Sequence, residues 1–200
     1  MLDCIDCDLQ NAAFAPILGG IRAFLLEKGV SVYDEESGNG LVRHIYLRIG
    51  EKTGEIMLCI VVNGTSLPAE KEFVARMTES FPAITSLWLN TNCENTNVVL
   101  GKEFRLLYGK AYIEDVLCNV RLRITPQSFY QVNRDAAELL YQKGAELADF
   151  RGDELLLDLY CGIGSIGLSM AHRVKRLIGI EVIPSAIECA KENAKQNGIE

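Results

Sequence analysis

Three glycines stand close together in the apolar stretch LLLDLYCGIGSIGL, residues 155–168. Gly162, Gly164 and Gly167 have the spacing G-x-G-x-x-G, which lets a backbone turn tightly and approach a nucleotide-derived cofactor. Glu181 ends the next apolar stretch, where an acid can accept hydrogen bonds from ribose hydroxyls. These residues predict a cofactor site, but the glycine spacing alone does not separate dinucleotides from other cofactors.

Asp158, four residues before Gly162, separates two classes of cofactor. A pyrophosphate would lie near the loop and the start of the next helix, where backbone N–H groups and the helix dipole favour negative charge. A carboxylate there would repel the pyrophosphate of NAD, but would attract the ammonium and sulfonium groups of S-adenosylmethionine. The motif therefore favours S-adenosylmethionine. An NAD-dependent Rossmann oxidoreductase remains the alternative, and Asp158 could instead only cap the following turn.

The segments around this loop alternate between strand and helix patterns. Asn133 can cap a helix that ends near Ala148, and we expect strands at 155–159 and 176–180 with helices at about 165–172 and 184–198. This order predicts the first half of a Rossmann-like α/β domain. Two parallel strands alone do not make a stable open sheet. We therefore expect an internal fragment of a longer protein, whose exposed sheet edge could self-associate.

The residues before Pro126 show a pattern typical of an α+β domain. Apolar residues at helical spacing predict helices over residues 14–25 and 68–81. LVRHIYLRIG and EIMLCIVVNG predict a hairpin, and further strands follow up to residue 125. We expect an α+β central domain with an antiparallel sheet. The expected boundaries are an upstream remnant at 1–9, the central domain at 10–125 and the truncated α/β half-domain at 126–200.

Composition limits the possible surroundings and partners of the chain. Its net charge of −7 argues against broad, non-specific nucleic-acid binding by these 200 residues alone. No apolar run is long enough to cross a membrane, and no signal peptide is visible at the N-terminus. The seven cysteines are scattered, which indicates a reducing, cytoplasmic environment rather than a disulfide framework. Cys4 and Cys7 form a single C-x-x-C pair, which is weak evidence for a metal site.

Three stretches together resemble a known family. LLLDLYCGIGSIGL, LIGIEVIPSAIECAKENAKQNGI and ITPQSFYQVNRDAAELLY are similar to segments of the RNA uracil-5-methyltransferases, which act on 23S rRNA and transfer RNA. The central region, including TNVVLGKEFRLLYG, is especially similar to the ribosomal branch. The resemblance implies methyl transfer from S-adenosylmethionine to C5 of a uridine in 23S rRNA, with tRNA as the alternative substrate.

The resemblance also assigns individual residues. It implies that Gln131, Tyr160 and Ser165 contact the cofactor and that Glu181 binds its ribose; Gln131 could instead only lead into the Asn133 cap. Cys7 resembles the last of four cysteines that hold a 4Fe–4S cluster in many members, so residues 1–9 would be the remnant of an iron–sulfur region.

The mechanism implied by the resemblance is covalent. A cysteine thiolate adds to C6 of the uracil, C5 takes the methyl group, and a base removes the C5 proton. The family's nucleophile and base would lie beyond residue 200, so we expect the fragment to be inactive and to bind cofactor weakly. Cys161 is interpreted as structural, because the loop needs a small side chain at that position.

Overall fold

The computed structural model describes residue 7 and residues 9–199, which divide into two compact units. The first unit combines Met1–Ile49 with Glu55–Ala111, and the second combines Gly50–Gly54 with Tyr112–Glu200. The sequence-based boundary between residues 125 and 126 therefore differs from the division in the structure. The hairpin that follows residue 111 accounts for the difference, because it packs against the last helix of the second unit.

The first unit contains a four-stranded sheet in the order β1-β2-β3-β4. Its strands are β1 (Val42–Ile49), β2 (Ile56–Val62), β3 (Ile84–Thr91) and β4 (Glu103–Gly109). Pairs β1–β2 and β3–β4 are antiparallel, as expected, but β2 and β3 run parallel. The sheet is therefore mixed rather than antiparallel throughout. Helix α2 (Glu70–Ser80) explains the parallel pair, because it returns the chain to the end of the sheet where β2 began.

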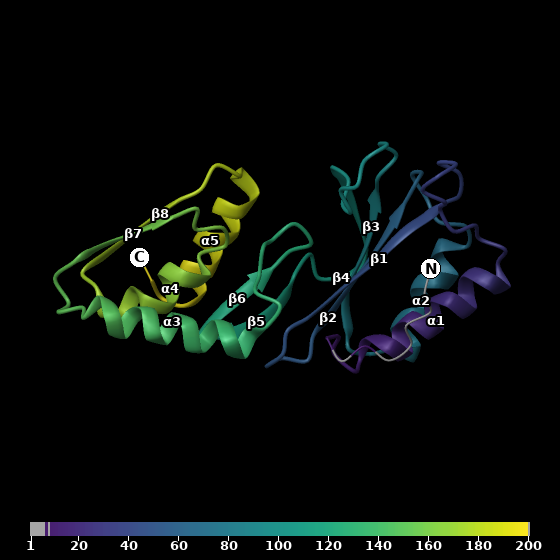
Figure 1. Cartoon of the computed structure of the whole chain (residues 1–200). Helices are drawn as coiled ribbons and strands as arrows, with labels where there is room; N and C mark the ends of the chain where they lie inside the picture. Colours follow the sequence, from purple (N-terminus) through teal and green to yellow (C-terminus); the bar gives the residue numbers. More distant parts are fainter. Residues whose placement is uncertain (1–6, 8, 200) are drawn as a thin grey trace. The chain divides into compact units, whose positions relative to one another are not determined.

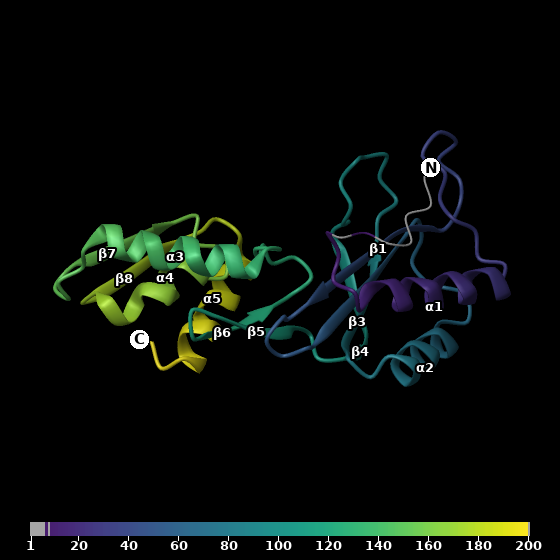
Figure 2. The same cartoon turned by 60° about the horizontal axis from the view of Figure 1, so that its bottom comes forward.

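Helices α1 (Phe14–Glu27) and α2 lie on one face of this sheet (Figure 2). Phe24 of α1 meets Phe73 of α2 edge to face, with ring centroids 5.1 Å apart, and both side chains are fully buried. All seven residues of β2 are buried, which fits a central strand covered on both faces. The two helices predicted from apolar spacing are therefore present, and both contribute buried residues to the core.

The second unit begins with the hairpin β5 (Ile113–Leu117) and β6 (Val120–Ile124). The order α3 (Arg134–Ala148), β7 (Leu155–Leu159), α4 (Ser165–Met170), a short 3₁₀ turn (Ala171–Arg173), β8 (Arg176–Ile180) and α5 (Pro184–Gln196) follows. The alternation of strands and helices expected from the sequence is confirmed. The carboxamide oxygen of Asn133 accepts a hydrogen bond from the Ala136 N–H at 3.0 Å, so Asn133 does cap α3.

Strands β7 and β8 form a two-stranded parallel sheet in which Asp158 pairs with Gly179. Helix α4 packs on both strands, and α3 packs on α4 (Figure 1). Leu155, Leu157 and Leu159 alternate along β7 and stay half exposed, which shows that one face of this small sheet is uncovered in the described residues. No helix in the described part of the chain combines the length and apolar character needed to cross a membrane.

Candidate functional site

The glycine-containing loop joins the carboxyl end of β7 to the start of α4. Tyr160, Gly162 and Gly164 have φ angles of +58°, +55° and +85°, so three of five consecutive residues have a left-handed backbone conformation. This conformation is easy for glycine but costs a residue such as tyrosine roughly 1 to 2 kcal/mol. The Tyr160 side chain is also 85% exposed. Strained, exposed residues of this kind cluster at ligand sites, which supports the choice of this loop as the candidate site.

Asp158 holds the first turn of α4. Its Oδ2 atom accepts a hydrogen bond from the Gly167 N–H at 2.8 Å. Partial burial raises the pKa of Asp158, although the Gly167 hydrogen bond opposes this rise. A Cβ atom on Gly167 would lie 2.7 Å from this carboxylate oxygen, so only glycine allows the approach. The capping role that the sequence left open for Asp158 is therefore present in the structure.

Glu181 follows β8 and ties the loop to the start of α5. Its Oε1 atom accepts hydrogen bonds from the N–H groups of Val182 at 2.7 Å and Ile183 at 3.0 Å. Its Oε2 atom accepts from the Gly162 N–H at 3.1 Å. The hydrogen bonds from Ile183 and Val182, with a smaller contribution from Gly162, lower the pKa of Glu181. The side chain is therefore ionised and fixed beside the loop at neutral pH.

These two carboxylates determine the electrostatics of the site. They accept hydrogen bonds from the N–H groups of Gly162 and Gly167, which would otherwise be available to a phosphate. Burial, together with the charges of Asp158 and Glu181, raises the pKa of Cys161. Its thiol therefore stays protonated and is a poor nucleophile. A Cβ on Gly179 would lie 2.9 Å from the Cys161 sulfur, so this side chain fills space against β8.

Of the other sequence-predicted residues, Ser165 and Gln131 belong to the same unit as the loop, whereas Cys7 belongs to the first unit. Ser165 is the first residue of α4 and is directly connected to the loop. Gln131 is half-buried in the segment before α3, and its side chain is not among the groups that hold the loop. Cys7 is a free, partly exposed cysteine, and Cys4 lies outside the described residues. Within residues 7 and 9–199, no three His, Cys, Asp or Glu side chains gather as metal ligands, so the cluster role of Cys7 stays a prediction.

Asn193 is a third side chain that holds the loop, and it was not predicted from the sequence. Its carboxamide nitrogen donates to the carbonyl oxygen of Ile163 at 3.0 Å, and the side chain is fully buried. Asn193 lies four residues after the buried Cys189, on the side of α5 that faces the interior. A polar residue at an apolar position of a helical pattern was the signal that could have identified it.

An apolar pocket of about 230 Å³ borders the loop. Asp158, Cys161 and Gly164 contribute to its wall, together with apolar side chains of α4, α5 and β8 such as Leu168 and Ile187. Most of this lining suits hydrocarbon or aromatic atoms, and its two charged side chains are Asp158 and Lys191.

The chain is similar to proteins that are more than twice as long. It is 40% identical over 193 residues to an uncharacterized RNA methyltransferase of Oceanobacillus iheyensis, covering 96% of this chain and 42% of the relative. An uncharacterized RNA methyltransferase of Staphylococcus aureus strain MSSA476 is 40% identical over 197 residues, covering 98% of this chain and 44% of the relative. The chain thus spans less than half the length of these curated relatives.

A solved structure of an RNA methyltransferase is also similar to this chain. The crystal structure of Pyrococcus abyssi tRNA (uracil-54, C5)-methyltransferase in complex with S-adenosyl-L-homocysteine matches all of this chain and 48% of that chain, with a TM-score of 0.84 and 27% identity. The family model for tRNA (uracil-5-)-methyltransferase matches residues 90–200. This match covers more than half of the chain and includes the whole glycine loop, so the chain belongs to the tRNA (uracil-5-)-methyltransferase family.

Proposed function

We propose that these residues form the cofactor-binding part of an S-adenosylmethionine-dependent enzyme that methylates C5 of a uridine in RNA. One observation carries the choice of cofactor: Glu181 accepts a hydrogen bond from the loop N–H of Gly162, and Asp158 accepts one from the Gly167 N–H in the first turn of α4, and a pyrophosphate would need such groups. A dinucleotide would bring further negative charge to this position, whereas a sulfonium and an ammonium would bring positive charge. Family membership supports the same choice.

The residues of the loop fit this cofactor. A Cβ atom on Gly162 would meet nothing within 4 Å, so the backbone there is open to a ligand. Oε1 of Glu181 already accepts two backbone hydrogen bonds, but Oε2 accepts only one, so a ribose hydroxyl can bind to Oε2 without displacing the backbone donors. Tyr160, Ser165 and Gln131 are proposed to contact the rest of the cofactor. Bound S-adenosylmethionine would supply an electrophilic methyl group.

Four cysteines in the described residues have raised pKa values, and none of them is assigned as the nucleophile. Burial raises the pKa of Cys59 to about 12, and it also raises the pKa of Cys161 and Cys189. Attack on C6 of uracil needs a thiolate, which these three side chains do not provide near neutral pH. They are proposed to be structural.

The cofactor can be tested by thermal unfolding with added ligands. Since a ligand at 100 times its Kd stabilises a protein by about 2.7 kcal/mol, millimolar S-adenosylhomocysteine should raise the Tm even when binding is weak. NAD at the same concentration should leave the Tm unchanged. Stabilisation by NAD alone would refute the proposal and favour the oxidoreductase.

The RNA substrate is the finer part of the proposal. Resemblance of the central region to the ribosomal branch favours 23S rRNA, while the Pyrococcus abyssi relative is named for a tRNA uridine. Mass spectrometry of 23S rRNA and tRNA from a strain that lacks the gene separates the two. We expect 5-methyluridine to disappear from 23S rRNA, and its loss from tRNA alone would refute that substrate.

A further inference from the structure

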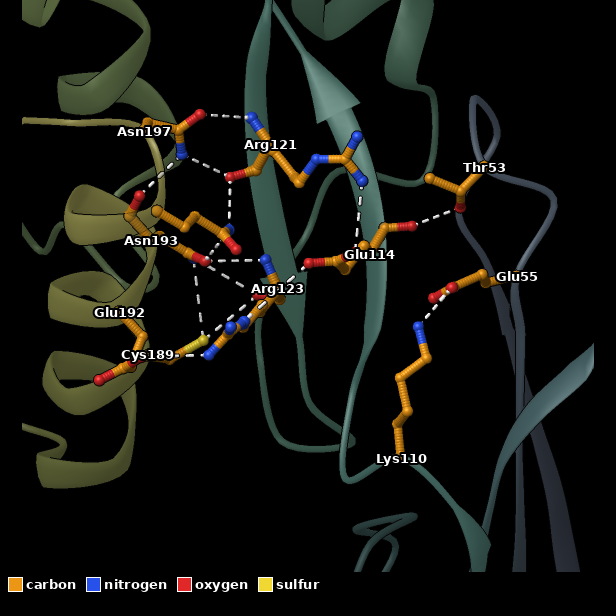
Figure 3. A network of polar contacts seen from close by, with 11 residues as sticks. Thr53, Glu55, Lys110, Glu114, Arg121, Arg123, Cys189, Glu192, Asn193 and Asn197 are labelled. Carbon is orange, nitrogen blue, oxygen red and sulfur yellow. Dashed lines mark hydrogen bonds and ion pairs between the residues drawn. The ribbon is translucent and has the colours of Figure 1, made fainter.

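Asn193 of α5 joins two segments that are far apart in the sequence. Its Nδ2 atom donates to the Ile163 carbonyl in the middle of the glycine loop at 3.0 Å. Its Oδ1 atom accepts from the Arg123 N–H of strand β6 at 2.8 Å, and Nδ2 also lies 3.4 Å from the Arg123 carbonyl (Figure 3). One buried carboxamide therefore connects the loop to the backbone of strand β6.

We propose that Asn193 is a positioning residue of the cofactor loop. Asp158 and Glu181 hold N–H groups of the loop, whereas Asn193 holds one of its carbonyl oxygens. Ile163 is 1% exposed, so water does not replace this partner easily. Ile163 also stands between Gly162 and Gly164, which are the residues with the greatest conformational freedom in the loop.

Only a carboxamide meets both requirements at this position. It donates through nitrogen to Ile163 and accepts through oxygen from Arg123 at the same time. An aspartate could still accept from the strand N–H, but it would place a carboxylate against two carbonyl oxygens. A buried carbonyl without its donor is costly, so the loop should move to find another partner.

Asn197, one helical turn later, provides a matched control. Its Oδ1 atom accepts from the Arg121 N–H at 2.9 Å, and its Nδ2 atom donates to the Arg121 carbonyl at 2.7 Å (Figure 3). Asn193 and Asn197 thus bind alternate residues of the same strand in the same manner. The described contacts of Asn197 are with β6 and its own helix, whereas Asn193 also reaches the loop.

Amide hydrogen exchange tests the proposal without any ligand. In Asn193→Asp, we expect the loop amides of Gly162 and Gly164 to exchange at least tenfold faster than in the wild type. In Asn197→Asp, the new carboxylate can still accept from the Arg121 N–H, and the loop amides should stay within about twofold of the wild type because the described contacts of Asn197 do not include the loop. A general loss of stability would instead raise exchange in both places in both variants. Equal loop exchange in the two variants would overturn the proposal.

Binding provides the second readout and rests on the proposed function. S-adenosylhomocysteine should bind Asn193→Asp at least tenfold more weakly than Asn197→Asp, as measured by calorimetry. If the wild type does not bind this ligand but the loop exchange changes as expected, the proposed function fails and the positioning role stands. Asn193→Ser is the second variant, because it introduces no charge. If both Asn193 variants fail to fold while Asn197→Asp folds, Asn193 stabilises the second unit as a whole rather than positioning the loop, and the proposal is overturned.

Discussion

Replacing Gly167 with alanine should separate packing from helix propensity in a single experiment. Gly167 lies in α4, where its N–H donates to Asp158 at 2.8 Å. A Cβ atom there would lie 2.7 Å from the Asp158 carboxylate oxygen and 2.9 Å from Cδ1 of Leu177. Both contacts are too short, so the aspartate has to move away and lose its hydrogen bond.

The expected magnitude follows from two opposing effects. Losing a hydrogen bond to a charged group costs about 1.5 to 3 kcal/mol, and the change from glycine to alanine in a helix returns up to about 1 kcal/mol. Gly167→Ala should therefore lower the free energy of unfolding by about 1 to 2 kcal/mol. Gly144→Ala in α3 is the matched control, because its Cβ would meet only Cε of Met170, at an ordinary 3.6 Å. That variant should be stabilised by about 0.5 to 1 kcal/mol.

Thermal and urea unfolding followed by circular dichroism will measure both variants. One kcal/mol corresponds to a Tm shift of about 4 to 8 °C in a domain of this size, so the two shifts should be easy to resolve and opposite in sign. A Gly167→Ala variant as stable as Gly144→Ala would show that the close approach of Asp158 to α4 is wrong.

Three further outcomes are expected. Tyr130→Phe removes the hydroxyl that donates to buried Asp115 at 2.9 Å, so urea unfolding should show a loss of about 1 to 3 kcal/mol; an unchanged midpoint would contradict the contact. Asn133→Ala should lose about 1 kcal/mol in the same assay, whereas Asn133→Ser should retain most of the cap. Since the pKa of Glu181 is lowered from 4.5, its contribution to stability is present above that pH and is lost as the pH falls through the lowered pKa. Tm values measured between about pH 5 and pH 3 should therefore fall less in Glu181→Gln than in the wild type, and parallel curves would contradict this.

The second unit was largely predictable from local patterns. Strand β7 and strand β8 were expected at the residues where they occur, and Asn133 was identified as the cap of α3. These features depend on apolar spacing and on capping chemistry, which act over a few residues. The direction of β3 in the first unit was not predicted, although the expected helix before it was a signal for a parallel crossover.

The candidate site was predictable in its residue types but not in its contacts. Asp158 and Glu181 were identified by their places after two strands, but their hydrogen bonds to loop N–H groups depend on side-chain direction. Asn193 was missed because its partners, Ile163 and Arg123, are 30 and 70 residues away. Contacts at such separations depend on how helices pack on strands, which a linear pattern does not specify.

The turn between β1 and β2 belongs to the second unit although both of its strands belong to the first. The Lys52 N–H donates to Asp115 at 2.8 Å, and the Thr53 hydroxyl donates to the Glu114 carbonyl. A shortened gene that begins at residue 112 would therefore deprive buried Asp115 of one of its two donors. Neither unit can be exchanged between relatives as one continuous piece of coding sequence, so recombination at a single crossover should yield poorly folded hybrids.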